Sequence, residues 1–369
     1  MLFRSDDGGS WRARPVRGRP AALGEHVVER AQGVRRQAAH FLAELGREPL
    51  RERLADVAGC SKEEIAINRN ASESIETIIF GLNLNKGDEV ILCKQDYPNM
   101  IHAWKQREMR DGIKLVWLSF DLPVDDDDEI VKRYTDAFTA QTRVVHITHI
   151  INWTGQIMPV KRIAQAAHKN NIEVLCDGAH SFTHIDYKIP DLDCDYFGTS
   201  LHKWMCAPLG TGMMYIKKEK IKSIWPLLAN DKPDSDDIRK FEVLGTRNFA
   251  SEQAIGNAIN FHNMIGAARK AERLRYLKNY WCQKVKSLDG LRFNTTLDYK
   301  KSCAICNVSM DGLDTGAFEA ALFSKHKIHT SPINWENIHG VRITPNVYTS
   351  LKDLDTLVLA LNEIATTKK

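Results

Sequence analysis

The chain has 369 residues, of which 43% are hydrophobic and 27% charged, with a mean hydropathy of −0.36 and a net charge of +4. These values exclude a disordered or fibrous chain, and the length predicts two domains. Because no run of about 18 apolar residues is present and Met1-Leu2-Phe3 leads directly into Arg4, we expect a cytoplasmic protein without a secretory signal or a membrane partner.

The beginning of the chain differs in composition from the remainder. Residues 1–24 are rich in Arg, Gly and Pro and predict an irregular tail. Residues 1–60 contain 11 Arg, no Lys and 8 acidic residues, so nearly all of the net charge lies there. Over residues 25–59 the apolar side chains recur at loosely helical spacing, broken at Gly46 and Pro49. This pattern predicts two amphipathic helices.

Strands and helices alternate after residue 60. The expected strands are 65–67, 89–93, 142–147 and 173–176, and the expected helices are near 75–82 and at 160–170. Alternation of this kind predicts an α/β fold with a mostly parallel sheet flanked by helices.

The pattern changes beyond residue 260. A long charged helix is expected at 264–287, strands at 303–309 and 340–344, and a last helix at 350–366. We therefore predict a smaller C-terminal α+β domain. The expected organisation is an Arg-rich tail at 1–24, a large domain with N-terminal helices at 25–260, and a small domain at 261–369.

Two common functions are not expected from composition. The basic excess is confined to the N-terminal segment, and the sequence has no nucleic-acid reader motif, so a basic-tailed nucleic-acid adaptor rests on that segment alone. Among eight scattered cysteines, Cys303 and Cys306 form the one CxxC pair, without a second pair or spaced histidines. They lie in an apolar run, which favours buried thiols over metal or redox chemistry, and no metal site is predicted.

An aspartate and a lysine carry the chemical signal. Asp177 ends a predicted strand and is followed by Gly178-Ala179-His180, and Lys203 follows 26 residues after Asp177. Ligands collect at the carboxyl ends of parallel strands, where this carboxylate could face a cationic ring nitrogen. A partly desolvated lysine has a lowered pKa and is a nucleophilic amine. Alone, each residue is more often a helix cap or a solvated side chain, but the pair suits pyridoxal 5'-phosphate (PLP) chemistry.

From about residue 60 onward the sequence resembles the class V aminotransferase family of fold-type I PLP-dependent enzymes, which includes cysteine desulfurases and isopenicillin N epimerase. The motifs that carry the resemblance are Asp177-Gly-Ala-His180 and Ser200-Leu-His-Lys203. The resemblance implies that Lys203 forms the internal aldimine and that Asp177 pairs with the pyridinium nitrogen. It places His180 near the ring oxygen, as a third catalytic candidate.

The resemblance extends to further cofactor-binding residues. It implies phosphate contacts from Ala71, Ser72, Ser200 and His202, a stacking ring from Tyr97, a contact to the phenolic oxygen from Asn152, and a phosphate contact from the partner subunit through the segment that contains Thr246. A helix N-terminus with a serine hydroxyl is also physically an anion site, although a plain N-cap and a surface tyrosine are simpler readings of Ser72 and Tyr97. A homodimer with a shared active site follows from the resemblance.

Arg342 corresponds to the arginine that binds the substrate α-carboxylate, and a planar guanidinium suits that group. A small-molecule amino-acid substrate is therefore expected, with Lys203 as the base at its α-carbon. Desulfurases place a nucleophilic cysteine shortly before this arginine, but residues 329–338 contain none. We expect an isopenicillin N epimerase-like epimerase or an aminotransferase, with Tyr97 or His180 as the second acid of an epimerase. A C–S lyase or desulfurase, and a catalytically silent PLP-fold binding protein, remain the alternatives.

Overall fold

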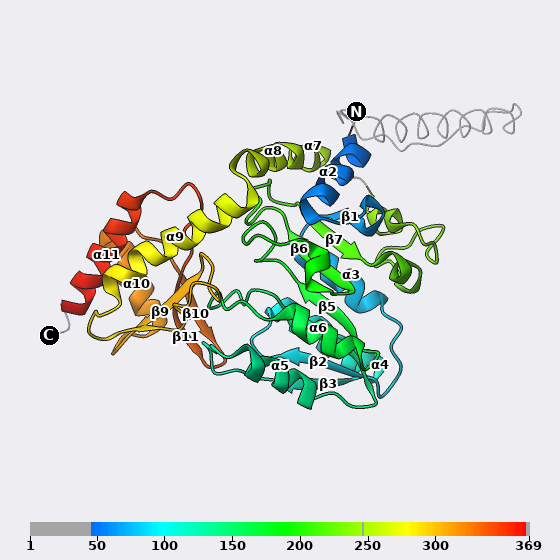
Figure 1. Ribbon diagram of the computed structural model, residues 1–369, viewed down its shortest axis with the longest axis horizontal. Helices are drawn as coiled ribbons and strands as arrows, with labels where there is room; N and C mark the ends of the chain where they lie inside the picture. Colours follow the sequence, from blue (N-terminus) through cyan, green and yellow to red (C-terminus); the bar gives the residue numbers. More distant parts are fainter. Residues whose placement is uncertain (1–45, 246, 367–369) are drawn as a thin grey trace, which may run out of the picture. The chain divides into compact units, whose positions relative to one another are not determined.

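The computed structural model describes residues 46–245 and 247–366. Two sheets organise this part of the chain, one of seven strands and one of four (Figure 1). The first of the two helices expected within 25–59 lies outside the described residues, and the second is present as α2 (Glu48–Ala58).

The seven-stranded sheet is mostly parallel. Its strands are β1 (Ile65–Asn68), β2 (Glu89–Cys93), β3 (Lys114–Leu118), β4 (Thr142–Thr148), β5 (Glu173–Asp177), β6 (Tyr196–Ser200) and β7 (Gly212–Ile216). They lie in the order β1-β7-β6-β5-β4-β2-β3, and β7 is the one strand of this sheet that runs opposite to the other six. The predicted fold class is confirmed, and the carboxyl ends of β2, β4, β5 and β6 lie along one edge.

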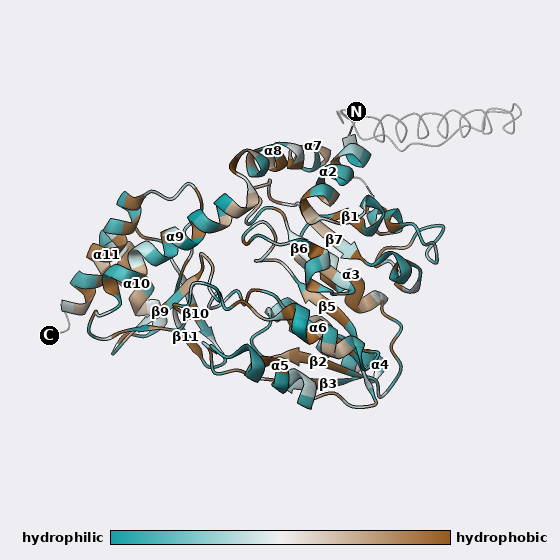
Figure 2. Ribbon diagram, in the orientation of Figure 1, coloured by the Kyte–Doolittle hydropathy of each residue, from teal (hydrophilic) through white to brown (hydrophobic). Residues whose placement is uncertain are grey.

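Helices cover this sheet, and their ends have identifiable sequence causes. The helical elements of this part are η2 (Lys62–Glu64), α3 (Ala71–Gly81), α4 (Pro98–Asp111), α5 (Asp127–Asp136), α6 (Val160–His168), η3 (Ile189–Leu192), η4 (Lys218–Ser223), η5 (Ile238–Glu242), α7 (Phe249–Gln253) and α8 (Ile255–Ile265). Asn70 caps α3 by accepting from the Glu73 N–H, and Pro98 starts α4, whose end is set by Gly112 in the left-handed region. Figure 2 shows polar residues on α5 and α6 and apolar residues in β2.

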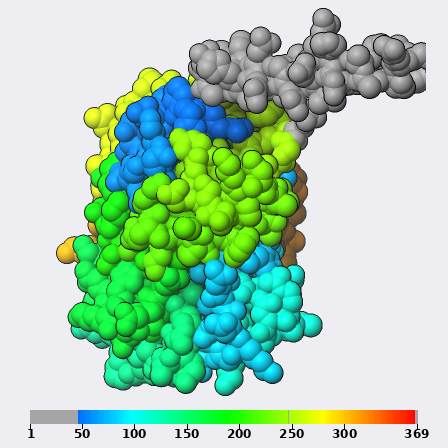
Figure 3. Space-filling model, turned by 90° about the vertical axis from the view of Figure 1, so that its right-hand side faces the viewer, coloured from blue at the N-terminus to red at the C-terminus, as the bar shows by residue number. Residues whose placement is uncertain are grey.

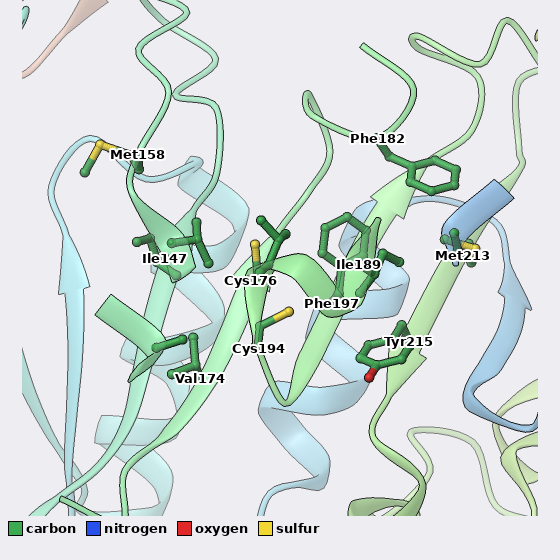
Figure 4. Close-up of a cluster of buried hydrophobic side chains, with 14 of the residues drawn as sticks. Ile147, Met158, Val174, Cys176, Phe182, Ile189, Cys194, Phe197, Met213 and Tyr215 are labelled. Carbon is green, nitrogen blue, oxygen red and sulfur yellow. The ribbon is translucent and has the colours of Figure 1, made fainter. Parts of the chain in front are cut away.

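The core has two layers because successive strand residues point to opposite faces of the sheet. On one face Ile147, Val174 and Cys176 pack with Phe197 and with side chains from the loops (Figure 4). Residues of these strands that point to the opposite face, such as Val144 and Leu175, join a separate cluster beneath α3 and α4. Strands buried on both faces read as continuous apolar runs, which is why β2, β4 and β5 were predictable.

The four-stranded antiparallel sheet forms the core of the C-terminal part. Its strands are β8 (Leu291–Phe293), β9 (Cys306–Met310), β10 (Ser331–Trp335) and β11 (Ile338–Ile343), in the order β10-β11-β9-β8. Its helices are α9 (Ala267–Val285), α10 (Thr315–His326) and α11 (Leu351–Thr366). The predicted α+β character is confirmed, whereas a domain boundary at 260/261 remains a proposal.

The helix expected at 264–287 is wrong at its start. α8 ends at Ile265, and α9 begins at Ala267, with Gly266 between them at φ 86°. A left-handed glycine ends a helix, so the apolar spacing that continues across Gly266 belongs to two helices.

Neither thiol of the CxxC pair is exposed. Cys303 and Cys306 are both fully buried, and the eight cysteines are free. Cys306 starts β9, and Cys303 precedes that strand. In the described residues no helix has the length and apolarity needed to cross a membrane, and no group of three or more His, Cys, Asp or Glu side chains is arranged to hold a metal.

Candidate active site

A cavity of about 220 Å³ opens at the carboxyl edge of the large sheet. Most of the predicted site residues line it, from the strand ends and from the N-termini of α3 and α4. The lining residues are Asn70, Ala71, Ser72, Ile75, Tyr97, Met100, Thr148, Ile150, Asn152, Asp177, Ala179, His180, Ser200, His202 and Lys203. Of the predicted residues, Arg342 lies beside the cavity rather than in its wall, and Thr246 lies outside the described residues.

Lys203 lies in the turn after β6 and faces the two other catalytic candidates. Its Nζ is 3.1 Å from Nε2 of His180. Burial lowers the pKa of Lys203, an effect that the Asp177 carboxylate opposes and the Arg342 guanidinium reinforces. Both the geometry and the direction of this shift favour a nucleophilic neutral amine at this position.

Asp177 is the last residue of β5 and is 3% exposed. Its Oδ1 accepts a hydrogen bond from the Ala179 N–H at 2.8 Å. Burial raises the pKa of Asp177, while this hydrogen bond and the charge of Lys203 lower it. A cationic ring nitrogen in the cavity would offset the cost of burying the carboxylate, so the residue fits its predicted role.

The N-terminus of α3 forms the opposite wall. A Cβ at Gly212 would lie 2.5 Å from the Asn70 nitrogen, so the glycine permits the close approach of β7 to the start of α3. The Ala71 N–H donates to Ser200 Oγ at 2.9 Å. The Ala71 amide is therefore engaged, and the Ser72 hydroxyl and the helix dipole remain as the predicted anion-binding elements.

Two cavity-lining side chains have a buried polar atom that finds no hydrogen-bond partner within residues 46–245 and 247–366. These atoms are Oδ1 of Asn152 and Nδ1 of His202. Buried polar atoms are normally paired, so such atoms in a cavity wall indicate a polar ligand. Together with the Lys203 amine and the Asp177 carboxylate, they form a donor and acceptor set that fits a phosphorylated pyridine aldehyde.

Tyr97 lies at the N-cap of α4, and the residue is 40% exposed. Its ring stacks on Trp153 with centroids 6.5 Å apart, and Trp153 stacks on Trp335 with centroids 5.6 Å apart. The Trp153 Nε1–H donates to the Gln95 carbonyl at 2.9 Å. The aromatic row therefore fixes Tyr97 at the rim of the cavity.

Arg342 lies on β11 of the small sheet, and its side chain contacts the loop that follows β4 of the large sheet. Its Nη1 donates to the Asn152 carbonyl at 3.0 Å, and its Nη2 donates to Ser331 Oγ at 3.3 Å. Its Nε has no partner among the described residues. The guanidinium is thus oriented beside the cavity with donor capacity left for a carboxylate.

Asp96 is a buried carboxylate near the cavity that the sequence analysis did not predict. Asp96 follows β2, is 2% exposed, and accepts from the Cys93 N–H and from Thr148 Oγ1, both at 2.7 Å. Thr148 lines the cavity at the end of β4 and was also missed. The signal for both was their position, since each ends or follows a parallel strand as Asp177 does.

Asp96 predicts a pH dependence of folding stability. Burial raises the pKa of Asp96 to about 7, against an unfolded value near 3.9. The folded state therefore holds a proton that the unfolded state releases between these values, so stability from this residue falls as pH rises from about 4 to about 7. The difference of about 3 between the two pKa values corresponds to roughly 4 kcal/mol.

We expect Asp96→Asn to weaken the pH dependence of the unfolding free energy between pH 4 and pH 7, as measured by denaturant unfolding. The exposed Asp121→Asn variant is the control for loss of one carboxylate. An Asp96→Asn profile parallel to that of the unmodified chain would contradict the buried, protonated Asp96.

The comparisons with known proteins agree with this geometry. A family model described as Aminotransferase class-V matches residues 25–332. Isopenicillin N epimerase of Amycolatopsis lactamdurans is 26% identical over 336 residues, which cover 85% of this chain and 84% of that protein. A cysteine desulfurase of Synechococcus elongatus is 27% identical over 359 residues, which cover 89% of this chain and 56% of that protein.

Solved structures share the fold. A cystine C–S lyase, solved in complex with its reaction product cysteine persulfide, has a TM-score of 0.80 at 20% identity and covers 93% of this chain and 94% of its own. The apo cysteine desulfurase of Thermococcus onnurineus has a TM-score of 0.77 at 22% identity, with coverage of 87% and 84%.

Proposed function

Because this chain belongs to the class V aminotransferase family, whose cofactor is pyridoxal 5'-phosphate, we propose that it acts at the α-carbon of an amino acid with the cofactor held by Lys203. The observation that carries the proposal is the convergence of Lys203, Asp177 and His180 in one cavity at the carboxyl edge of the sheet. The cofactor, when bound, supplies an electron sink that stabilises negative charge at the substrate α-carbon.

The side chains have separate tasks in this proposal. Ser72, Ser200 and His202 hold the phosphate, and Asn152 and His180 contact the ring substituents. The Asp177 carboxylate keeps a proton on the ring nitrogen, and Arg342 holds the substrate carboxylate. Nζ of Lys203 takes the proton from the α-carbon, which its lowered pKa favours at neutral pH.

We place epimerisation first among the possible outcomes. His180 contacts Lys203 and so shares its side of the cavity, whereas Tyr97 comes from the start of α4. Tyr97 is therefore our candidate for the second acid, which returns a proton to the other face of the α-carbon. The relatives named above are an epimerase and a desulfurase, so transamination ranks below both.

The hairpin formed by β10 and β11 argues against desulfurase chemistry. This hairpin occupies the part of the sequence in which the desulfurase branch is expected to carry its cysteine. It is held in place by the Trp335 Nε1–H, which donates to the Lys94 carbonyl at 2.9 Å. No cysteine is among the described residues that line the cavity. Cys93, which lies near it, is 2% exposed, and burial raises the pKa of its thiol.

A homodimer and a cytoplasmic location remain part of the proposal. Trp225, Leu227, Leu228 and Val243 are each 43–51% exposed, and the segment that carries them spreads over the face seen in Figure 3. Exposed apolar side chains grouped in this way suit contact with a second copy of the chain. Sedimentation equilibrium of the purified protein tests the dimer directly.

The proposed function is tested by α-proton exchange. The purified protein, loaded with PLP, is incubated in D₂O with single L- and D-amino acids and followed by proton NMR and chiral chromatography. Exchange with loss of optical purity supports epimerisation. Sulfide released from cysteine would favour the desulfurase alternative, and absence of exchange with every amino acid would favour a silent binding protein.

Arg342→Gln is expected to raise KM for the amino acid about 10- to 100-fold with a smaller change in kcat, because a charge-assisted hydrogen bond to the substrate carboxylate is lost. Steady-state kinetics with any amino acid that exchanges measures this. Arg292→Gln, on the exposed face of β8, is the control for loss of a positive charge. An unchanged KM would place the carboxylate site elsewhere.

A further inference from the structure

Trp204, the residue after Lys203, is held rigidly beside the cavity. It is 4% exposed and packs in a cluster with Ile150 and Ile305. One face of its indole stacks on the His184 ring, with centroids 3.5 Å apart and planes 20° apart. Its Nε1–H points at the His180 ring and donates to Nδ1 at 3.3 Å.

The His184 ring that stacks on Trp204 is itself held by two hydrogen bonds. Its Nε2 accepts from the Ala304 N–H at 2.9 Å. The proton of the neutral ring is therefore on Nδ1, which donates to the His180 carbonyl at 2.8 Å. The backbone of Trp204 is also fixed, because Lys270 donates to its carbonyl oxygen. The indole is thus buried, stacked on one face, and held at its backbone carbonyl.

The tautomer of His180 follows from this arrangement. An indole N–H is a donor only, so Nδ1 of His180 must be an acceptor. The proton of the neutral imidazole is then on Nε2, 3.1 Å from Nζ of Lys203. We propose that Trp204 is a positioning residue that fixes His180 as the Nε2–H tautomer and so directs a hydrogen-bond donor at the nitrogen of Lys203. The role of Lys203 rests on the proposed function, whereas the tautomer does not.

The charges around His180 keep its ring neutral. Burial lowers the pKa of His180 most, and Lys203, Arg342, His184 and His202 lower it further. The Asp177 carboxylate is the negative charge that acts on the Lys203 amine, whose pKa it raises. A neutral ring that donates from Nε2 stabilises the unprotonated form of the Lys203 nitrogen. Loss of the Trp204 donor should therefore raise the pKa of that nitrogen.

The tautomer is tested first on the cofactor-free full chain. Nitrogen-15 NMR of histidine-labelled protein, with His180→Gln to assign the signal, should show the Nε2–H form in the unmodified chain. Trp204→Phe keeps a ring on His184 but removes the N–H, and should populate the Nδ1–H form. Trp281→Phe is the matched control, because Trp281 is fully buried and its Nε1 has no partner among the described residues.

The second readout is the pH titration of the visible absorption band after PLP is added. Trp204→Phe should move its midpoint upward by about one pH unit, the size expected when one hydrogen bond to the neutral form is lost. Trp281→Phe should not move it, and in a His180→Gln background Trp204→Phe should have no further effect. A Trp204→Phe chain that keeps the Nε2–H tautomer, or a midpoint shift that persists without His180, overturns the inference. A missing band in the unmodified chain overturns the proposed function instead, and the NMR result still decides the tautomer.

Discussion

Lys203→Ala is expected to abolish the visible absorption band that forms when PLP is added and to reduce α-proton exchange at least about 10³-fold. Among the described residues, this amine is the one lysine nitrogen in the cavity wall, and in the proposed function it serves both as the covalent attachment and as the base at the α-carbon. Because loss of the Lys203 nitrogen removes both functions, the exchange rate should fall further than when any hydrogen-bond partner is removed. Absorption spectra and proton NMR in D₂O measure the two losses separately.

The control for this variant is Lys161→Ala, which removes an exposed lysine from α6. It should bind PLP and exchange α-protons at the rate of the unmodified chain. Added methylamine is a second control, because a small amine that enters the cavity should restore part of the exchange in Lys203→Ala. Full exchange in Lys203→Ala without added amine would contradict the assignment of the base.

The fold could be predicted where burial on both faces made a strand continuously apolar. β2, β4 and β5 were found for this reason. β6 was missed because Gly198 and its neighbours Thr199 and Ser200 carry little apolar signal. A Cβ at Gly198 would lie 2.4 Å from Ile75 Cγ1, so the tight packing of α3 on β6 requires a residue that weakens the strand pattern. Local sequence cannot express such a long-range requirement.

Site residues could be predicted from the sequence where they lie at the end of a predicted strand or within a sequence motif. Asp177 was predicted because both properties coincide there, whereas Lys203 was predicted from its motif, since the strand before it was missed. Asp96 and Trp204 were not, because their roles depend on contacts with Thr148 and His180 that sequence spacing does not reveal. The resemblance to the family located Asn152 and Arg342. The structure adds that the Arg342 guanidinium donates to the Asn152 carbonyl.

Asp177→Asn is expected to separate stability from catalysis. The asparagine Oδ1 can still accept the Ala179 N–H, and burial raises the pKa of Asp177, so the buried charge costs free energy in the cofactor-free protein. The melting temperature of that form should be unchanged or higher. The exchange rate should fall about 10²- to 10³-fold, because in the proposed function the Asp177 charge keeps the ring nitrogen protonated.

Asp195→Asn is the matched control, because it should have the opposite effects on stability and on activity. Asp195 is 4% exposed and lies outside the cavity, where it accepts from the Val174 N–H at 2.8 Å and pairs with His168 and Lys217. Its loss should lower the melting temperature and leave the exchange rate per folded molecule unchanged. If Asp177→Asn instead lost stability and activity together, as a structural residue would, Asp177 would be a scaffold carboxylate and the ring nitrogen would need another partner.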